Sequence, residues 1–184
     1  MPSGGVCASA PLNCCTDVKP LRLAADTNVL LDLAQGIGDV IDALEIIDER
    51  LRNADQLVPP SVLDEFVYFA DSGQTPVVRQ SARLALKQLR GARRFRPILE
   101  LPFAPEQADE LARRLRSGGL LPADEVHDSR ILAETALLNC GILLSSDEHL
   151  RGIDHQQLTW ILNPYDLAPP IIATPIEIVR KFFR

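Results

Sequence analysis

The hydrophobic pattern of the chain consists of short, mainly apolar runs separated by longer amphipathic stretches. A short apolar run between polar or turn residues is typical of a buried strand. The sequence contains four such runs, which are residues 21–25, 56–58, 142–146 and 158–162. Residues 96–101, with the sequence RPILEL, fit either an irregular strand or an extended connection.

Between these runs, apolar residues recur at the three- and four-residue spacing of an amphipathic helix. In residues 40–51, for example, Val40, Leu44 and Ile47 fall on one face. The helices predicted in this way are residues 28–34, 40–51, 61–70, 76–89, 105–115, 122–140 and 173–183. Strands that alternate with helices predict an α/β fold, with a mainly parallel central sheet between two helical layers in a three-layer α/β/α sandwich.

Two of the predicted helices start with capping signals. Ser61 can cap the helix over residues 61–70, with Asp64 near the position that the acidic residue of a capping box takes. Asp124 can cap the helix over residues 122–140.

Length and composition indicate one globular domain with an N-terminal leader. Residues 1–20 are rich in Pro, Gly, Ser and Cys, so we expect a poorly ordered leader there and a single domain over residues 21–184. Three of the four cysteines fall in the leader and the fourth is Cys140, which predicts neither a disulfide framework nor a paired zinc site. No apolar run approaches the ~20 residues of a membrane helix. We therefore expect a cytoplasmic protein with reduced thiols.

The charge is acidic overall, at −6, but it is unevenly distributed. Between Ser72 and Leu99 there are seven basic residues and no acidic ones. Four of them are spaced four, four and three residues apart and share one helix face: Arg79, Arg83, Lys87 and Arg90. Such a face either follows an anionic polymer such as RNA or is simply solvated, and the sequence favours neither interpretation.

Four acidic residues occupy positions from which they can meet. Asp26 and Asp147 directly follow apolar runs, and the carboxyl ends of parallel strands are where α/β proteins bind ligands. Glu65 and Asp128 lie in the first turns of two predicted helices. His127 and His149 lie near the acidic positions and either could contact a substrate, but exposed loop or helix positions explain them better than ligand roles do.

The segments ADTNVLLDL, VPPSVLDEF and HDSRILAETALLNCGILLSSDEHL, in this order, resemble the PIN-domain family of metal-dependent nucleases. The resemblance implies that Asp26, Glu65, Asp128 and Asp147 form an acidic pocket that binds Mg²⁺ or Mn²⁺. It also implies supporting roles for Asn28 and Ser145. Asp124 shares a helix face with Asp128 and is a second candidate; we prefer Asp128 as the metal-facing acid and Asp124 as the cap.

The implied activity is cleavage of RNA by a metal-dependent endoribonuclease. Two carboxylates about 4 Å apart repel by about 4 kcal/mol at an effective dielectric constant near 20, so the metal-free pocket should contain at least one raised pKa. The resemblance further implies a toxin silenced by an antitoxin protein, or a nuclease without such a partner, and a homodimer as in many relatives. The alternative is a non-catalytic module with the same fold that binds RNA or a protein partner.

Overall fold

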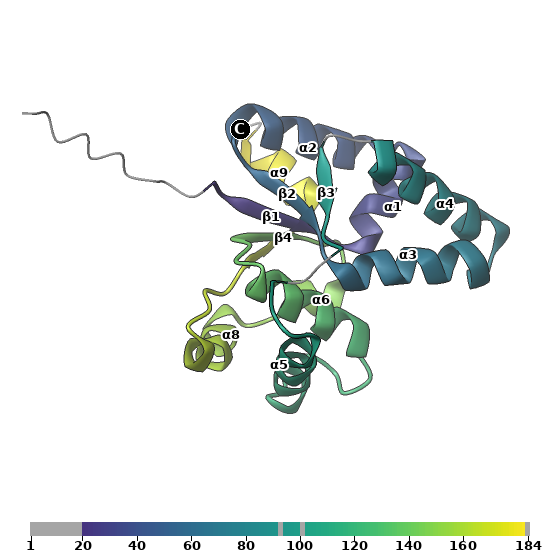
Figure 1. The fold of residues 1–184 in the computed structure, drawn as a ribbon. Helices are drawn as coiled ribbons and strands as arrows, with labels where there is room; N and C mark the ends of the chain where they lie inside the picture. Colours follow the sequence, from purple (N-terminus) through teal and green to yellow (C-terminus); the bar gives the residue numbers. More distant parts are fainter. Residues whose placement is uncertain (1–19, 92–93, 100–101, 183–184) are drawn as a thin grey trace, which may run out of the picture.

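A central sheet of five parallel strands, in the order β3-β2-β1-β4-β5, runs through the described residues of the computed structural model (Figure 1). These are residues 20–91, 94–99 and 102–182. The strands are β1 (Arg22–Ala25), β2 (Asp55–Val58), β3 (Phe95–Pro97), β4 (Ile142–Leu144) and β5 (Ile171–Ala173). The predicted leader lies outside the described residues, except for Pro20.

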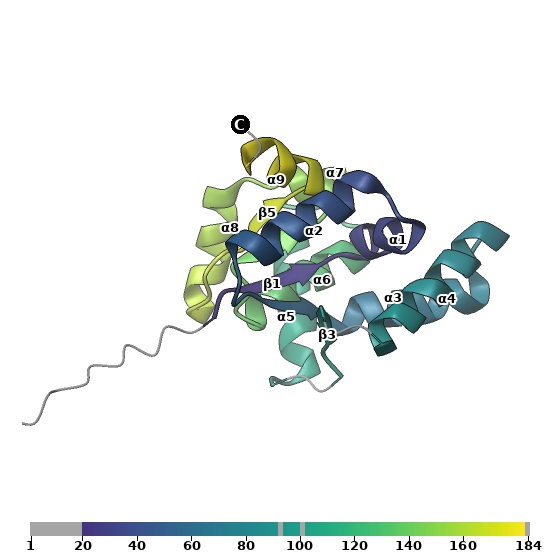
Figure 2. The same cartoon turned by 90° about the horizontal axis from the view of Figure 1, so that it is seen from above.

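Helices cover both faces of this sheet. They are α1 (Thr27–Gln35), α2 (Gly38–Arg50), α3 (Pro60–Ser72), α4 (Pro76–Gly91), α5 (Pro105–Ser117), α6 (Val126–Leu137), α7 (Glu148–Arg151), α8 (His155–Leu162) and α9 (Pro175–Phe182), with a short 3₁₀ helix at Asn163–Tyr165. Figures 1 and 2 show α2 and α9 on one face and α5, α6 and α8 on the other. The helical pair α3 and α4 extends beyond the sheet (Figure 2). The predicted three-layer α/β/α architecture is confirmed.

The two central strands, β1 and β4, are apolar over residues 23–25 and 142–144 because both faces of the sheet are covered. In β1, Leu23, Ala24 and Ala25 are all fully buried, so no polar residue alternates with them. Of the sequence RPILEL, Arg96 and Pro97 lie in the short edge strand β3, which begins at Phe95. Pro97 is tolerated there because an edge strand does not need every backbone N–H for pairing.

The prediction of a strand over residues 158–162 is wrong, because these residues belong to α8. The Asp154 side chain caps this helix by accepting a hydrogen bond from the backbone N–H of Gln157 at 2.8 Å. Leu158 and Leu162 are buried one turn apart. A five-residue apolar run fits a short helix as well as a strand, and the actual edge strand, β5, follows later in the chain.

The capping box predicted at Ser61 and Asp64 is also wrong. Helix α3 begins at Pro60, where the missing N–H and fixed φ of proline suit the first helical turn. Ser61 instead donates both its backbone N–H and its hydroxyl to the carboxylate of Glu134, at 2.9 and 2.7 Å. The first turn of α3 is therefore bound by the carboxylate of Glu134, a fully buried residue of α6.

Cys140, the one cysteine among the described residues, is a buried free thiol. Burial raises its pKa to about 12, which makes it unreactive. Over the described ranges, no helix is both long and apolar enough to cross a membrane.

Candidate functional site

The candidate site lies where the chain changes direction across the sheet. From β1, the chain builds β2 and β3 on one side and later returns to place β4 and β5 on the other. Asp26 follows β1, and its backbone N–H donates to the carbonyl of Leu144, the last residue of β4, at 2.9 Å. This crevice between neighbouring strands, at their carboxyl ends, is the usual ligand site of open parallel sheets.

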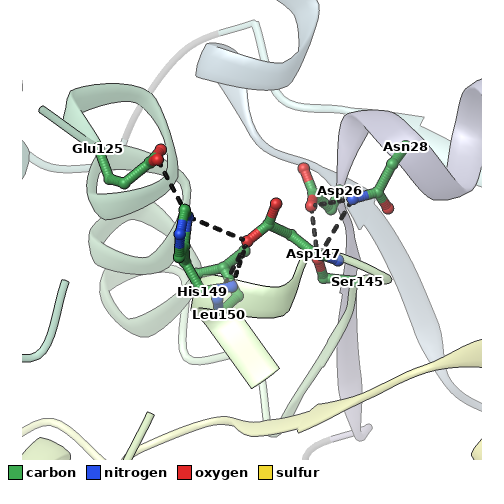
Figure 3. Close-up of polar contacts among 7 residues, drawn as sticks. All are labelled: Asp26, Asn28, Glu125, Ser145, Asp147, His149 and Leu150. Carbon is green, nitrogen blue, oxygen red and sulfur yellow. Dashed lines mark hydrogen bonds and ion pairs between the residues drawn. The ribbon is translucent and has the colours of Figure 1, made fainter. Parts of the chain in front are cut away.

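Asp26 is buried and held by three donors. Its Oδ1 accepts the N–H of Thr27 at 2.6 Å, and its Oδ2 accepts the hydroxyl of Ser145 at 2.6 Å and the amide of Asn28 at 2.9 Å (Figure 3). Burial raises the pKa of Asp26, although the hydrogen bonds from Ser145 and Thr27 lower it in part. These hydrogen bonds hold the Asp26 carboxylate in one orientation, and they offset part of the free-energy cost of burying its charge.

Ser145 and Asn28 join the two strand ends. The hydroxyl of Ser145, which donates to Asp26, also accepts the N–H of Asp147 at 3.0 Å. The side-chain oxygen of Asn28 accepts the N–H of Ser146 at 3.1 Å. Two polar side chains therefore set the spacing between the loop after β1 and the loop after β4.

Asp147 caps α7 at the end of the second loop. One of its oxygens, Oδ1, accepts the N–H groups of His149 and Leu150 at 2.8 and 3.2 Å. Its other oxygen points away from this helix end (Figure 3). The carboxylate is thereby oriented by backbone donors, while its other oxygen accepts no hydrogen bond from the described residues.

Asp128 lies in the first turn of α6 and is half-buried. Burial, followed by the negative charges of Asp147, Asp26 and Glu125, raises its pKa to about 7. This agrees with the sequence-based expectation that a metal-free acidic pocket contains a raised pKa. Three carboxylates from α6 and the two strand ends therefore share one electrostatic environment.

Glu65 approaches the same group from α3. Its charge contributes to the raised pKa of Asp26, and its Oε2 lies 2.8 Å from Nε2 of His127. Burial lowers the pKa of His127, but the contact with Glu65 and the charges of Glu65, Asp128 and Asp26 raise it overall. His127 is therefore an ion-pair partner of the site rather than a solvated helix residue.

The prediction that Asp124 caps the helix after it is wrong. Helix α6 begins at Val126, and its N-cap residue, Glu125, makes no side-chain capping bond. Asp124 lies exposed in the preceding turn.

Glu125 and His149 also lie at the candidate site. The sequence analysis did not single out Glu125, and for His149 it preferred an exposed position over a ligand role. Oε1 of Glu125 lies 3.0 Å from Nδ1 of His149, which is 4.0 Å from Oδ1 of Asp147 (Figure 3). Glu125, Asp128 and His149 each offer a ligand atom within 4.8 Å of the others. The available signal was the three-residue spacing between Glu125, the N-cap residue of α6, and Asp128 in its first turn.

The donor set fits a hard divalent cation. It consists mainly of carboxylate oxygens, the ligands that Mg²⁺ and Mn²⁺ prefer. Burial first, and then the negative charges of neighbouring carboxylates, raise the pKa values of Asp26 and Asp128, so ionising these side chains carries a cost in the metal-free site. A divalent cation would offset that cost.

The basic residues of α4 lie apart from this acidic group. Arg79 donates to the carbonyl of Gly73 at 2.5 Å and Arg83 to that of Ala70 at 3.0 Å, so both cap the end of α3. Lys87 and Arg90 are exposed. Within the described part of the chain, none of the four forms an ion pair with an acidic residue of the site.

Comparison with known proteins agrees with this architecture. The sequence matches the PIN domain family over residues 24–156, and the comparison with curated proteins gives no significant match. Similar solved structures include VapBC2 from Rickettsia felis bound to a DNA fragment from their promoter, with a TM-score of 0.55 and 16% identity. VapBC-1 from nontypeable Haemophilus influenzae has a TM-score of 0.52 and 17% identity. Each match covers 84% of this chain and 98% of the other.

At these identities the two structures establish a shared fold, and the family match spans well over half of the sequence, including all four predicted acidic residues. The chain belongs to the PIN-domain family.

Proposed function

We propose that this protein is a metal-dependent endoribonuclease that hydrolyses phosphodiester bonds of RNA. Its catalytic and metal-binding residues are Asp26, Glu65, Asp128 and Asp147. The observation that carries the proposal is the convergence of acidic residues from α3, α6 and two strand ends on one electrostatic environment, in which the pKa of Asp128 is about 7. Membership of a family whose members are generally nucleases supports it.

The cofactor that fits this donor set is Mg²⁺ or Mn²⁺. When bound, such an ion supplies an electrophile that activates water and offsets the charge on a phosphodiester. The chain's own residues prepare the site: Ser145 and Asn28 fix the orientation of Asp26, and His127 holds Glu65. Asp128 must lose its proton to become a ligand, so ion binding releases a proton near neutral pH.

RNA is the proposed substrate, with the basic face of α4 as part of its binding surface. Lys87 and Arg90 are exposed there and can contact phosphates. Arg79 and Arg83 each donate a hydrogen bond to a carbonyl at the end of α3, so only their remaining N–H groups can contact RNA. A one-signed surface on a chain of net charge −6 favours an anionic polymer locally.

Removing one site carboxylate tests the nuclease. We expect Asp26→Asn and Asp147→Asn each to lower Mn²⁺-dependent cleavage of end-labelled single-stranded RNA at least 100-fold. Asp64→Asn changes an exposed acid beside Glu65 and should cleave like the wild type. Full activity in Asp26→Asn would contradict the site assignment.

Thermal unfolding separates the nuclease from the non-catalytic alternative. We expect Mn²⁺ to raise the Tm of the wild type by several degrees, as a ligand that binds only the folded state does. This increase should be lost in Asp26→Asn and Asp147→Asn. If Mn²⁺ leaves the Tm of the wild type unchanged and the wild type cleaves no RNA, the result would favour the alternative of a module that only binds RNA or a protein partner.

Within the nuclease function, we propose a cytoplasmic toxin that pairs with an antitoxin protein. The two similar structures are VapBC complexes, which supports a protein partner. We also propose a homodimer, which only the family resemblance implies. Expression of the chain alone should arrest bacterial growth, and expression of Asp26→Asn should not. Equal growth with both, while the purified wild type cleaves RNA, would contradict the toxin role and leave the nuclease intact.

A further inference from the structure

A cleft of about 350 Å³ opens at the end of the sheet opposite the acidic site. It is lined by Leu21, which precedes β1, and by the first residues of β4 and β5, Ile142 and Ile171. The helices α2 and α9, which pack against each other, supply the remaining walls, including Ile47 and Ile178. Ala173, the last residue of β5, also lines the cleft, so the cleft extends along β5 beneath these helices.

The cleft is apolar and remains partly open to solvent. Ile47 and Ile178 are buried, whereas Leu21 and Ile171 at its border are 39% and 59% exposed. An apolar depression that stays open to solvent is a candidate ligand site. Its volume lies within the lower range of known small-molecule sites.

Two positively charged side chains lie at the border of this cleft, one on each helix. Arg50 ends α2 and Lys181 lies in the last turn of α9, and both are exposed. Within the described residues, neither forms a hydrogen bond or ion pair. The acid that lines the cleft, Glu177, is already bound by the N–H of Thr174 at 2.9 Å and by Arg151 at 3.4 Å.

The charge around the cleft therefore favours an anion. The carboxyl ends of two helices contribute roughly half a negative charge each, which two full positive charges outweigh. This local excess contrasts with the net charge of −6 for the whole chain.

We propose that the cleft binds a small amphipathic anion, namely a free medium-chain fatty acid. Its hydrocarbon chain would replace water on the isoleucine and leucine side chains, and its carboxylate would lie between Arg50 and Lys181. Nucleotides and sugars fit poorly, because an apolar wall leaves their polar groups without partners. The site is independent of the proposed nuclease activity.

Isothermal titration of the full chain with decanoate tests this site. For a ligand of this size, we expect a Kd on the order of 10–100 µM. Decyltrimethylammonium, which has the same chain length and the opposite charge, should bind at least about tenfold more weakly. Equal affinity for the two probes would overturn the proposal.

A matched pair of variants locates the binding. Arg50→Gln with Lys181→Gln should weaken decanoate binding about tenfold. Arg52→Gln with Arg180→Gln removes the same charge from exposed positions outside the cleft and should leave the affinity unchanged. Equal loss of affinity in both variants would overturn the proposal. Absence of decanoate binding would overturn it too, including the case in which another part of the chain or a second copy closes the cleft.

Discussion

At the residue scale, the carboxylates of the acidic site differ in how they are compensated. Asp26 receives three hydrogen bonds and Asp147 receives two from backbone N–H groups. Asp128 accepts none within the described residues, and it has the pKa of about 7. In the metal-free site, Asp128 is therefore the carboxylate whose negative charge is stabilised least by hydrogen bonds.

Replacing this residue should make the metal-free protein more stable at high pH. The ordinary pKa of an aspartate side chain is 3.8, whereas that of Asp128 in the folded chain is about 7, so protonation stabilises the folded state. This stabilisation is complete below pH 3.8 and is lost as the pH rises through 7. Asn carries no charge at any pH, so Asp128→Asn should exceed the wild type in EDTA at pH 8 by about 1–2 kcal/mol, a value that discounts the full shift for partial exposure.

Urea unfolding at two pH values measures this difference. At pH 5.5 the advantage of Asp128→Asn should fall to about half of its value at pH 8. Asp124→Asn removes an exposed acid four residues earlier and should match the wild type at both. An advantage of the same size at both pH values would show that the charge of Asp128 is not the cause.

The sequence predicted the main acids of this site because their positions follow from simple geometry. Asp26 and Asp147 directly follow apolar runs, and parallel strands bring such residues to one edge. The contact between Glu125 and His149 was not predicted, for a different reason. Their contact joins the start of α6 to α7 across the sheet edge, and no local spacing encodes a contact between residues of separate elements.

At the element scale, α3 and α6 are joined by a buried polar contact. Glu134 is fully buried, and burial raises its pKa while the hydrogen bonds from Ser61 and the ion pair with Arg130 lower it in part. The helix that carries Asp128 thereby fixes the start of the helix that carries Glu65. The contact thus contributes to the relative position of two site residues.

A double-mutant cycle should detect this coupling. We expect Ser61→Ala to lower the free energy of unfolding by about 1–2 kcal/mol and Glu134→Gln by about 2–4 kcal/mol, because each leaves a buried partner unsatisfied. The double variant should lose about 1–2 kcal/mol less than the sum. Ser72→Ala removes an exposed hydroxyl and should stay within about 0.5 kcal/mol of the wild type. Strict additivity of Ser61→Ala and Glu134→Gln would contradict the coupling.

The elements themselves were predictable where periodicity extended over several turns. The long helices were identified, and so were β1, β2 and β4, but the three-residue strand β5 was not. Residues 158–162 and Ser61 were assigned wrongly because tertiary contacts decided them. Leu158 and Leu162 are buried as a helical pair, and Ser61 is bound by an acid 73 residues away.

At the scale of the whole molecule, charge is separated between two regions. The acidic site lies at the sheet edge, and the basic residues of α4 lie on the helical pair that extends beyond the sheet (Figure 2). An RNA strand that contacts both would be held by phosphates on α4 while one phosphodiester enters the acidic site. This separation allows RNA binding and metal binding to be changed independently.

Reversing the exposed charges of α4 should therefore weaken RNA binding alone. Lys87→Glu with Arg90→Glu is the cleanest double variant, because Arg79 and Arg83 also cap α3. We expect about a 10- to 100-fold loss of affinity for single-stranded RNA at low salt, and a slope of log K against log salt shallower by about 1.4. Filter binding across a salt series measures both quantities.

The matched control reverses two exposed arginines elsewhere, Arg113→Glu with Arg180→Glu, which changes the net charge equally. If RNA responds only to net charge, both double variants lose affinity alike, and α4 has no special role. If α4 is the contact surface, the control keeps most of its affinity and its salt slope. In both variants, the increase in Tm caused by Mn²⁺ should equal that of the wild type, because neither changes a residue of the acidic site.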